Sequence, residues 1–298
     1  DGVVVVDKFF LKELSFKESL VFDLESPNWF YGLADALSRK PDRRWLSLSE
    51  KFQKGLESHK IQFYFKDDSL EKFVQSSNWS LSLKVFSGED FLGISWASVK
   101  NGGTLLELAE HRVNIFEDGS VVDKLNAVVK QNDVLDSQNY FKIYLPSGSQ
   151  ILKAEGFSPR EKIPDFDYAG QMFLTDGRIE KTLKLEKTVA VNADFFSESG
   201  FDVVAGWVNL KPGSRSSIVL EYVLPFKLNR KNAFADYRLK MTRPRQNENV
   251  PFRLVIVPEK GVELIALEPD GFVSQNLGEY QSGLAKDLVM DASLVFKE

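Results

Sequence analysis

The sequence predicts an α+β protein, in which a mixed α/β unit at residues 1–103 precedes an antiparallel, immunoglobulin-like β-sandwich region at residues 104–298. Three observations predict this organisation. Apolar residues recur at mixed spacings up to about residue 103, and from about residue 104 they recur at every second position. Turn-forming dipeptides separate the alternating segments of the second part. Runs that mix helices and strands before runs of strands alone are typical of α+β chains.

The composition is that of an ordinary globular protein. The 298 residues are 43% hydrophobic and 27% charged, which excludes collagenous, coiled-coil and disordered chains. With 43 acidic and 38 basic side chains the net charge is −5, which argues against a nucleic-acid partner. Apolar runs such as Val3–Val6 are far shorter than the roughly 18 residues of a spanning helix. Zero cysteines exclude disulfides and thiolate metal sites.

The chain opens on an apolar strand. Asp1 and Gly2 stand directly before Val3–Val6, and a strand this apolar is usually buried between neighbours on both faces. We therefore expect a processed, truncated or incomplete chain. Any export signal or membrane anchor would lie in the missing portion.

Helices and strands alternate up to residue 103. Asp7 is the candidate cap of a first helix and Ser26-Pro27 begins a second. A third helix is predicted around residues 45–58 from apolar spacings of three and four. Ile61–Phe65 has the branched and aromatic content of a strand. Asp68 and Glu71 then form a candidate capping pair for a short helix through Val74.

The second part predicts ten to twelve strands, either one large sandwich or two modules with a boundary near residues 158–167. Alternating segments include Tyr140–Leu145, Tyr237–Met241 and Phe252–Ile256. The turn dipeptides between strands are Asp118-Gly119, Ser147-Gly148, Asp176-Gly177, Pro212-Gly213, Lys260-Gly261 and Asp270-Gly271.

Four segments carry a family resemblance. These are Asp1–Asp7, His59–Asp67, Asn139–Pro146 and Leu220–Phe226, which correspond in order and approximate spacing to "DGVxxxD", "KHIQLYFKD", "NYxRVYVP" and "LxYxLPF". Together they resemble the bacterial domain-of-unknown-function family 4012, over about residues 1 to 260. The first two residues of the second motif are exchanged here, and the family's N-terminal half is absent. The resemblance implies a protein tethered outside the cytoplasmic membrane by an N-terminal helix.

Few residues suggest catalytic or metal chemistry. The two histidines, His59 and His111, are 52 residues apart and lack a carboxylate at a metal-ligand spacing, so the sequence predicts neither a zinc site nor a Ser-His-Asp triad. Acidic groups at Glu89-Asp90, 133–136 and 165–167 lack the pattern of a calcium loop and are interpreted as solvated loops. No catalytic residue, resident metal or cofactor is predicted.

One basic cluster supports an alternative. Residues 1–14, the segment 37–44 and the following helix are similar in order to the C-terminal half of the LytR-CpsA-Psr phosphotransferases. That similarity implies that Arg39, Arg43 and Arg44 would hold the diphosphate of a polyprenyl-linked glycan, with magnesium bound by carboxylates in the missing half. The Arg-Gln pair of that family has no counterpart, since Trp45 follows. The more common interpretation of such a cluster is a solvated helix face.

We therefore expect a membrane-anchored, extracytoplasmic envelope protein that acts as a structural or binding module at the bacterial cell surface. Its expected partners are other envelope proteins or a surface glycan, reached through edge strands and loops. The alternative is a phosphotransferase that attaches a glycan to the cell wall, with Mg²⁺ as its cofactor.

Overall fold

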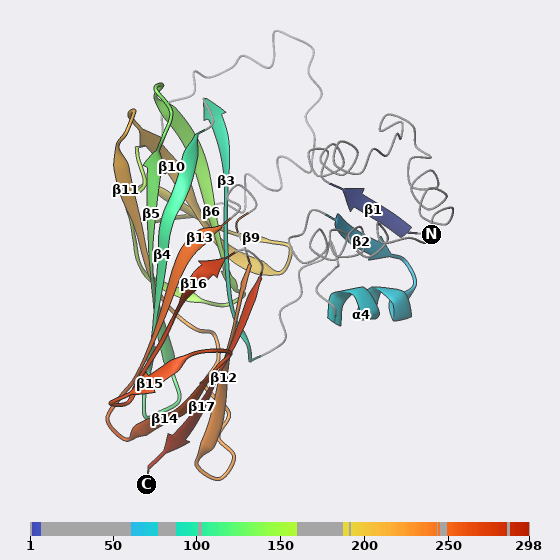
Figure 1. Ribbon diagram of the computed structural model, residues 1–298, viewed down its shortest axis with the longest axis vertical. Helices are drawn as coiled ribbons and strands as arrows, with labels where there is room; N and C mark the ends of the chain where they lie inside the picture. The colour runs from blue at the N-terminus through green and yellow to red at the C-terminus, as the bar shows by residue number, and fades with distance from the viewer. Residues whose placement is uncertain are drawn as a thin grey trace, which may run out of the picture. The chain divides into compact units, whose positions relative to one another are not determined.

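The computed structural model describes residues 2–6, 61–76, 88–100, 103–159, 187–190, 192–242, 244, 249–284 and 287–297. These residues are nearly all β (Figure 1), so the predicted α+β class is wrong. The predicted helices that begin near Asp7, Ser26 and Trp45 lie outside the described residues. The chain divides into two compact units, residues 1–84 and 85–298, which are described separately.

The described residues of the first unit form one antiparallel pair of strands and one helix. Strand β1 (Gly2–Val6) pairs antiparallel with β2 (Ile61–Phe65), and α4 (Asp68–Ser76) follows. The predicted strand at Ile61–Phe65 and the short helix are confirmed. The predicted cap is displaced by one residue, because the Asp67 carboxylate accepts hydrogen bonds from the backbone N–H groups of Ser69 and Leu70 at 3.0 Å.

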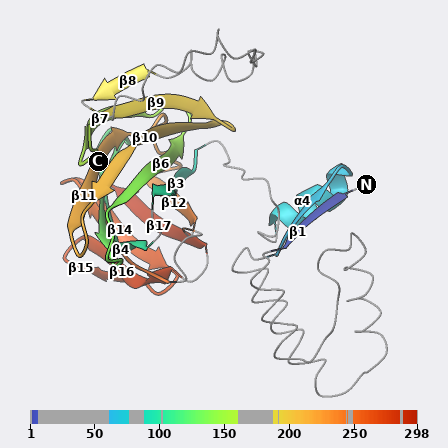
Figure 2. The same cartoon turned by 90° about the horizontal axis from the view of Figure 1, so that it is seen from above.

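The second unit is a sandwich of two large sheets that lie face to face (Figures 1 and 2). The eight-stranded sheet has, in spatial order, β14 (Val262–Glu268), β17 (Leu288–Phe296), β12 (Phe234–Thr242), β3 (Asp90–Lys100), β6 (Ser137–Pro146), β10 (Phe201–Leu210), β9 (Ala193–Glu198) and β8 (Lys187–Ala190). The seven-stranded sheet has β15 (Phe272–Ser274), β16 (Leu277–Leu284), β13 (Val250–Pro258), β4 (Thr104–Ile115), β5 (Val121–Gln131), β11 (Arg215–Val223) and β7 (Gln150–Glu155). Strand β3 precedes residue 104, where the predicted sandwich region begins, and it pairs within the eight-stranded sheet.

Both sheets are mixed rather than antiparallel, which corrects the immunoglobulin-like prediction. β12 pairs parallel with β3, with Leu239 opposite Asp90, and β13 pairs parallel with β4, with Leu254 opposite His111. Each parallel pair joins strands that are more than a hundred residues apart in the sequence. Alternation within a strand specifies which face is buried, and it does not specify the direction of the neighbouring strand.

The core lies between the sheets, where the inward side chains of both meet. In β5 every second residue from Val121 to Gln131 is buried. The larger sheet contributes the rings of Trp96 and Phe141, which stack with centroids 5.2 Å apart. The alternating strands predicted at Tyr140–Leu145, Tyr237–Met241 and Phe252–Ile256 are confirmed within β6, β12 and β13.

The four outer strands are short or interrupted. β15 has 3 residues and β8 has 4, whereas β4 in the middle of its sheet has 12. β-bulges interrupt β7 opposite Glu221 and Tyr222, and β14 between Leu264 and Ala266. The sheet edges also approach each other, because β7 contacts β8 and β14 contacts β15. Short, bulged and covered edges discourage pairing with another chain.

Several of the predicted turns use glycine for its conformational freedom. Gly119, Gly148, Gly213 and Gly261 have φ between 69° and 100°, a region that disfavours residues with a Cβ atom. The predicted turn at Asp176-Gly177 lies outside the described residues. Among the described helices, none has the length and apolar character needed to span a bilayer.

Candidate buried polar site

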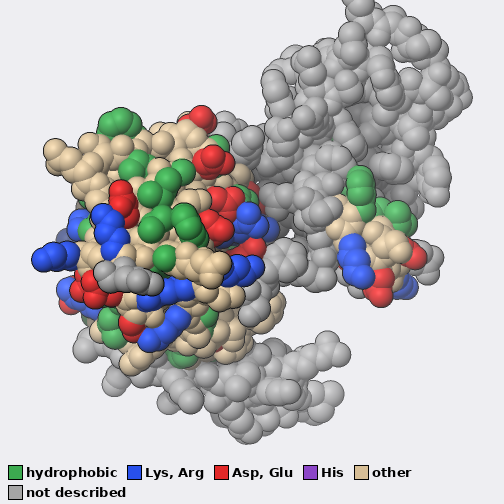
Figure 3. Space-filling model, turned by 90° about the horizontal axis from the view of Figure 1, so that it is seen from below, with side chains coloured by type: hydrophobic (Ala, Val, Ile, Leu, Met, Phe, Trp, Pro, Cys, Tyr) green, Lys and Arg blue, Asp and Glu red, His purple; other side chains and the backbone are tan. Residues whose placement is uncertain are grey.

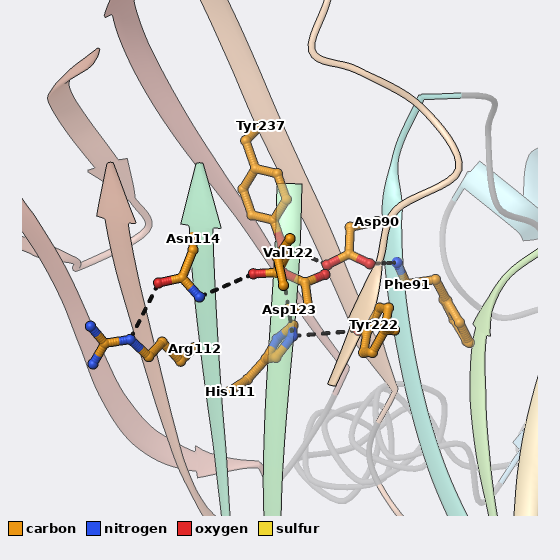
Figure 4. A network of polar contacts seen from close by, with 9 residues as sticks. All are labelled: Asp90, Phe91, His111, Arg112, Asn114, Val122, Asp123, Tyr222 and Tyr237. Carbon is orange, nitrogen blue, oxygen red and sulfur yellow. Dashed lines mark hydrogen bonds and ion pairs between the residues drawn. The ribbon is translucent and has the colours of Figure 1, made fainter. Parts of the chain in front are cut away.

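Five polar side chains meet in the apolar core between the two sheets (Figure 4). The larger sheet contributes Asp90 at the start of β3 and Tyr237 from β12. The smaller sheet contributes His111 from β4, Asp123 from β5 and Tyr222 from β11. We call these five residues the core cluster. Tyr237 is 1% exposed and the other four are 0% exposed, so the cluster is sealed from solvent.

Strand register brings the members of the core cluster together. Val113 lies opposite Asp123, and His111 lies opposite Leu125 two positions away, which puts His111 and Asp123 on the same inward face. Asp123 also lies opposite Tyr222 on the neighbouring strand. In the other sheet the parallel pairing of β12 with β3 brings Tyr237 close to Asp90.

Both carboxylate oxygens of Asp90 accept hydrogen bonds. The Tyr237 hydroxyl donates to Oδ2 of Asp90 at 2.5 Å, and the Phe91 backbone N–H donates to Oδ1 at 2.7 Å. Burial raises the pKa of Asp90 to about 6, although both hydrogen bonds act in the opposite direction. The carboxyl group is therefore held in place, and its ionisation is shifted toward neutral pH.

Asp123 and His111 are not supplied in the same way. Within the described part of the chain, no hydrogen bond of ordinary geometry reaches either carboxylate oxygen of Asp123 or the Nδ1 atom of His111, although Asp90 and Tyr222 approach the Asp123 carboxyl group. The Nε2 atom of His111 lies 3.5 Å from the Tyr222 hydroxyl and 3.9 Å from Oδ1 of Asp123. A buried carboxylate without a partner is costly unless it is protonated or neutralised by a cation.

The electrostatics of these two residues follow from burial. Burial, and then the charge of Asp90, raise the pKa of Asp123 well above its usual range. Burial lowers the pKa of His111 to about 3, so its imidazole is neutral at pH 7. Burial also raises the pKa values of Tyr222 and Tyr237, so both phenols keep their protons.

The core cluster was not found from the sequence. Asp90 was grouped with Glu89 as a solvated loop, and this interpretation is wrong because Asp90 is fully buried in β3. The acidic group at 133–136 is exposed as predicted, and the group at 165–167 lies outside the described residues. Asp123 occupies an inward position of an alternating strand where apolar residues are the rule, and that was the available signal.

The structure does not describe the sequence-predicted phosphate site. Arg39, Arg43 and Arg44 lie outside the described residues, as does His59. The phosphotransferase alternative therefore stays a prediction. The same holds for the resemblance to family 4012.

Comparison with known proteins adds no functional assignment. No protein-family model matches the chain, and no curated protein matches it. Among solved structures, a protein from Legionella pneumophila described as nutrient-binding is similar at a TM-score of 0.37 and 9% identity, over 68% of this chain and 72% of that one. The folded domain of LppM from Mycobacterium tuberculosis is similar at a TM-score of 0.30 and 8% identity, over 67% and 95% of the two chains.

An M1 zinc metallopeptidase from Deinococcus radiodurans is similar at a TM-score of 0.33 and 9% identity, over 65% of this chain and 42% of that one. These scores and identities are too low to transfer a binding or catalytic role to this chain.

Proposed function

We propose that this chain is a non-catalytic binding or structural module of the bacterial cell envelope, anchored to the membrane and displayed outside the cytoplasm. The observation that carries the proposal is the sealing of the core cluster. A catalytic acid, base or nucleophile must reach its substrate. Asp90, His111 and Asp123 are 0% exposed and no substrate can reach them without opening the sandwich.

The short and bulged outer strands favour a separate module over a polymer formed by strand addition. A polymer built by strand addition needs a long, regular outer strand to pair with the next copy. The outer strands β15 and β8 have 3 and 4 residues, and β7 and β14 are bulged. We therefore assign partner contacts to exposed side chains of the sheets and loops, and not to backbone pairing along a sheet edge.

Exposed apolar side chains offer a surface for such contacts. Phe272 on β15 is 68% exposed and Phe234 at the start of β12 is 62% exposed. Figure 3, which looks onto the lower end of the sandwich, shows hydrophobic side chains gathered between charged ones. Exposed Phe side chains favour a protein partner over a glycan, because Phe has no polar group with which to orient a sugar.

The support for the envelope location comes from the sequence. The four motifs that resemble family 4012 imply a tethered protein outside the cytoplasmic membrane.

The location is tested in intact cells. A tagged full-length protein should be cleaved by protease added to spheroplasts, while a cytosolic marker is protected. A photo-crosslinking residue at Phe272 or Phe234 should give discrete adducts with envelope proteins. The same residue at Lys153, on the opposite outer strand β7, serves as the control and should give none. Protection of the tagged protein, or equal adducts at all three positions, would contradict the proposal.

The enzyme alternative is tested with the same full-length protein. Incubation with a polyprenyl-diphosphate glycan and Mg²⁺ should give no transfer. Transfer that is lost in Arg43→Ala would show that the protein is a phosphotransferase and would refute the non-catalytic assignment.

A further inference from the structure

Three side chains of the kinds that bind metal ions meet inside the sandwich. Asp90, His111 and Asp123 each offer one ligand atom, and these atoms all lie within 4.8 Å of one another. Ligands bound at about 2.0 to 2.2 Å from a zinc ion lie about 3.3 to 3.6 Å apart in a tetrahedral site. The distance of 3.9 Å between Nε2 of His111 and Oδ1 of Asp123 is close to that spacing. Small side-chain rotations would bring the two atoms to the distance that a bound ion requires.

Unpartnered atoms point to a missing ligand at this position. Both oxygens of Asp123 are buried without a hydrogen-bond partner of ordinary geometry in the described residues, although Asp90 and Tyr222 approach this carboxyl group. Buried polar atoms in folded proteins are nearly always satisfied by protein, water or an ion. Exposed acidic clusters are common, whereas a buried carboxyl group with two unpartnered oxygens is exceptional and needs either a proton or a counter-charge.

The charges match a divalent cation. Two ionised carboxylates and one neutral imidazole carry a charge of −2 together, and a divalent ion makes the buried group neutral. An imidazole binds a metal ion in its neutral form, so it adds no charge to this count. A monovalent cation would leave one negative charge in the apolar core.

We propose that Asp90, His111 and Asp123 bind one divalent transition-metal ion of the zinc class between the two sheets. The donor set selects this class, because imidazole suits zinc and its first-row neighbours, while calcium and magnesium prefer sites built from oxygen alone. A structural zinc site is closed and four-coordinate, and this one is sealed by the core.

The two tyrosines complete the site. The Tyr222 hydroxyl keeps its proton, lies 3.5 Å from Nε2 of His111, and is placed to hydrogen-bond a ligand. The Tyr237 hydroxyl donates to Oδ2 of Asp90 and orients that carboxylate as an outer-shell donor. Because Asp90 comes from one sheet and His111 and Asp123 from the other, the ion would join the two sheets.

The test is made on the 298-residue chain refolded from denaturant. One sample refolds with Zn²⁺ and another with EDTA, because a sealed site is filled during folding. After gel filtration in metal-free buffer, the first sample should retain about one zinc per chain by native mass spectrometry. Its thermal midpoint should be several degrees above that of the EDTA sample, since a ligand that binds only the folded state stabilises it.

Variants separate a built site from surface adsorption. Asp123→Asn and His111→Gln should each reduce retained zinc at least about tenfold and abolish the difference between the zinc and EDTA midpoints. Asp118→Asn is the matched control, because Asp118 is an exposed aspartate in the turn between β4 and β5 and contacts Lys227. It should retain zinc like the wild type.

The stability of Asp123→Asn in EDTA distinguishes a lost metal site from misfolding. In EDTA this variant should be at least as stable as the wild type, because it removes an uncompensated buried carboxyl group, so its loss of zinc cannot be attributed to misfolding. Equal midpoints of the wild type with Zn²⁺ and EDTA would overturn the proposal. Zinc retained equally by Asp123→Asn and the wild type would also overturn it.

Discussion

The hydroxyl of Tyr237 donates a 2.5 Å hydrogen bond to Oδ2 of Asp90, a residue 147 positions away in the sequence, and their strands β12 and β3 pair in parallel. This hydrogen bond holds the carboxyl group of Asp90 in place. It depends on the fold, because the parallel pairing of β12 with β3 brings the phenol close to that carboxyl group.

Loss of this hydroxyl should destabilise the fold. In Tyr237→Phe the buried Oδ2 of Asp90 loses its donor, which should cost about 1 to 3 kcal/mol in the free energy of unfolding. The measurement is urea denaturation at pH 7 in EDTA. Tyr144→Phe is the control, because the Tyr144 hydroxyl is half-buried and lies 3.5 Å from Glu198. A loss in Tyr237→Phe no larger than in the control would contradict the prediction.

The metal-free protein should lose stability as the pH rises from about 6.5 to 8. The folded pKa of Asp90 is about 6 and that of Asp123 is raised well above 3.8. The unfolded chain has released both protons above about pH 4. Asp90 therefore lowers the free energy of unfolding only up to about pH 6, and above pH 6.5 the expected loss comes from Asp123, whose pKa the charge of Asp90 also raises, at up to about 1.4 kcal/mol per pH unit. His111, whose pKa falls from 6.5 to about 3, acts in the opposite direction, but only below about pH 6.5.

Urea denaturation in EDTA at several pH values checks this dependence. Asp123→Asn should remove most of the slope above pH 6.5, and Asp118→Asn should retain it. A wild-type stability that stays level or rises across this window would show that Asp123 is ionised in the folded state without a counter-ion.

A close backbone contact should make one glycine irreplaceable. A Cβ atom at Gly156, where φ is +91°, would lie 2.0 Å from the carbonyl oxygen of Ser217. Gly156→Ala combines this overlap with left-handed backbone strain and should cost about 2 to 5 kcal/mol. At Gly200, where φ is +84°, a Cβ atom meets nothing within 4 Å, so Gly200→Ala should show only the backbone strain of about 1 to 2 kcal/mol. Equal losses of thermal stability would contradict the packing around Gly156.

Replacing a buried and an exposed Phe should have very different effects on the free energy of unfolding. Phe141 is 0% exposed and stacks on Trp96 between the sheets. Phe141→Ala should lower the free energy of unfolding by about 3 to 5 kcal/mol. Phe272→Ala, at a residue that is 68% exposed, should change it by less than about 0.5 kcal/mol. Chemical denaturation measures the free energy of unfolding of both variants. Comparable losses in the two would contradict the assignment of Phe141 to the hydrophobic core.

Local structure was predictable because local rules determine it. The alternation in Tyr140–Leu145 reports one buried face, and Gly119 and Gly148 report turns that need positive φ. These features depend on neighbours in the sequence, and the structure confirms them. The predicted fold class was wrong in two respects: β3 (Asp90–Lys100) was placed in an α/β unit but pairs within the larger sheet, and both sheets contain a parallel pair of strands.

The core cluster depends on contacts that no local rule contains. His111 and Asp123 meet through the register of β4 with β5, and Asp90 joins them from the opposite sheet. A metal-ligand search by sequence spacing finds ligands on one loop or helix, and it fails when three strands supply one ligand each. The one local signal was Asp123 itself, an acidic residue at a position of β5 that faces the core.

The most direct test of the central claim is an anomalous difference map from crystals of the chain refolded with Zn²⁺. The account predicts one strong peak between β3, β4 and β5, bonded to one imidazole nitrogen of His111 and to carboxylate oxygens of Asp90 and Asp123. Coordinates without a peak, in which a protonated Asp123 hydrogen-bonds directly to Asp90, would contradict it.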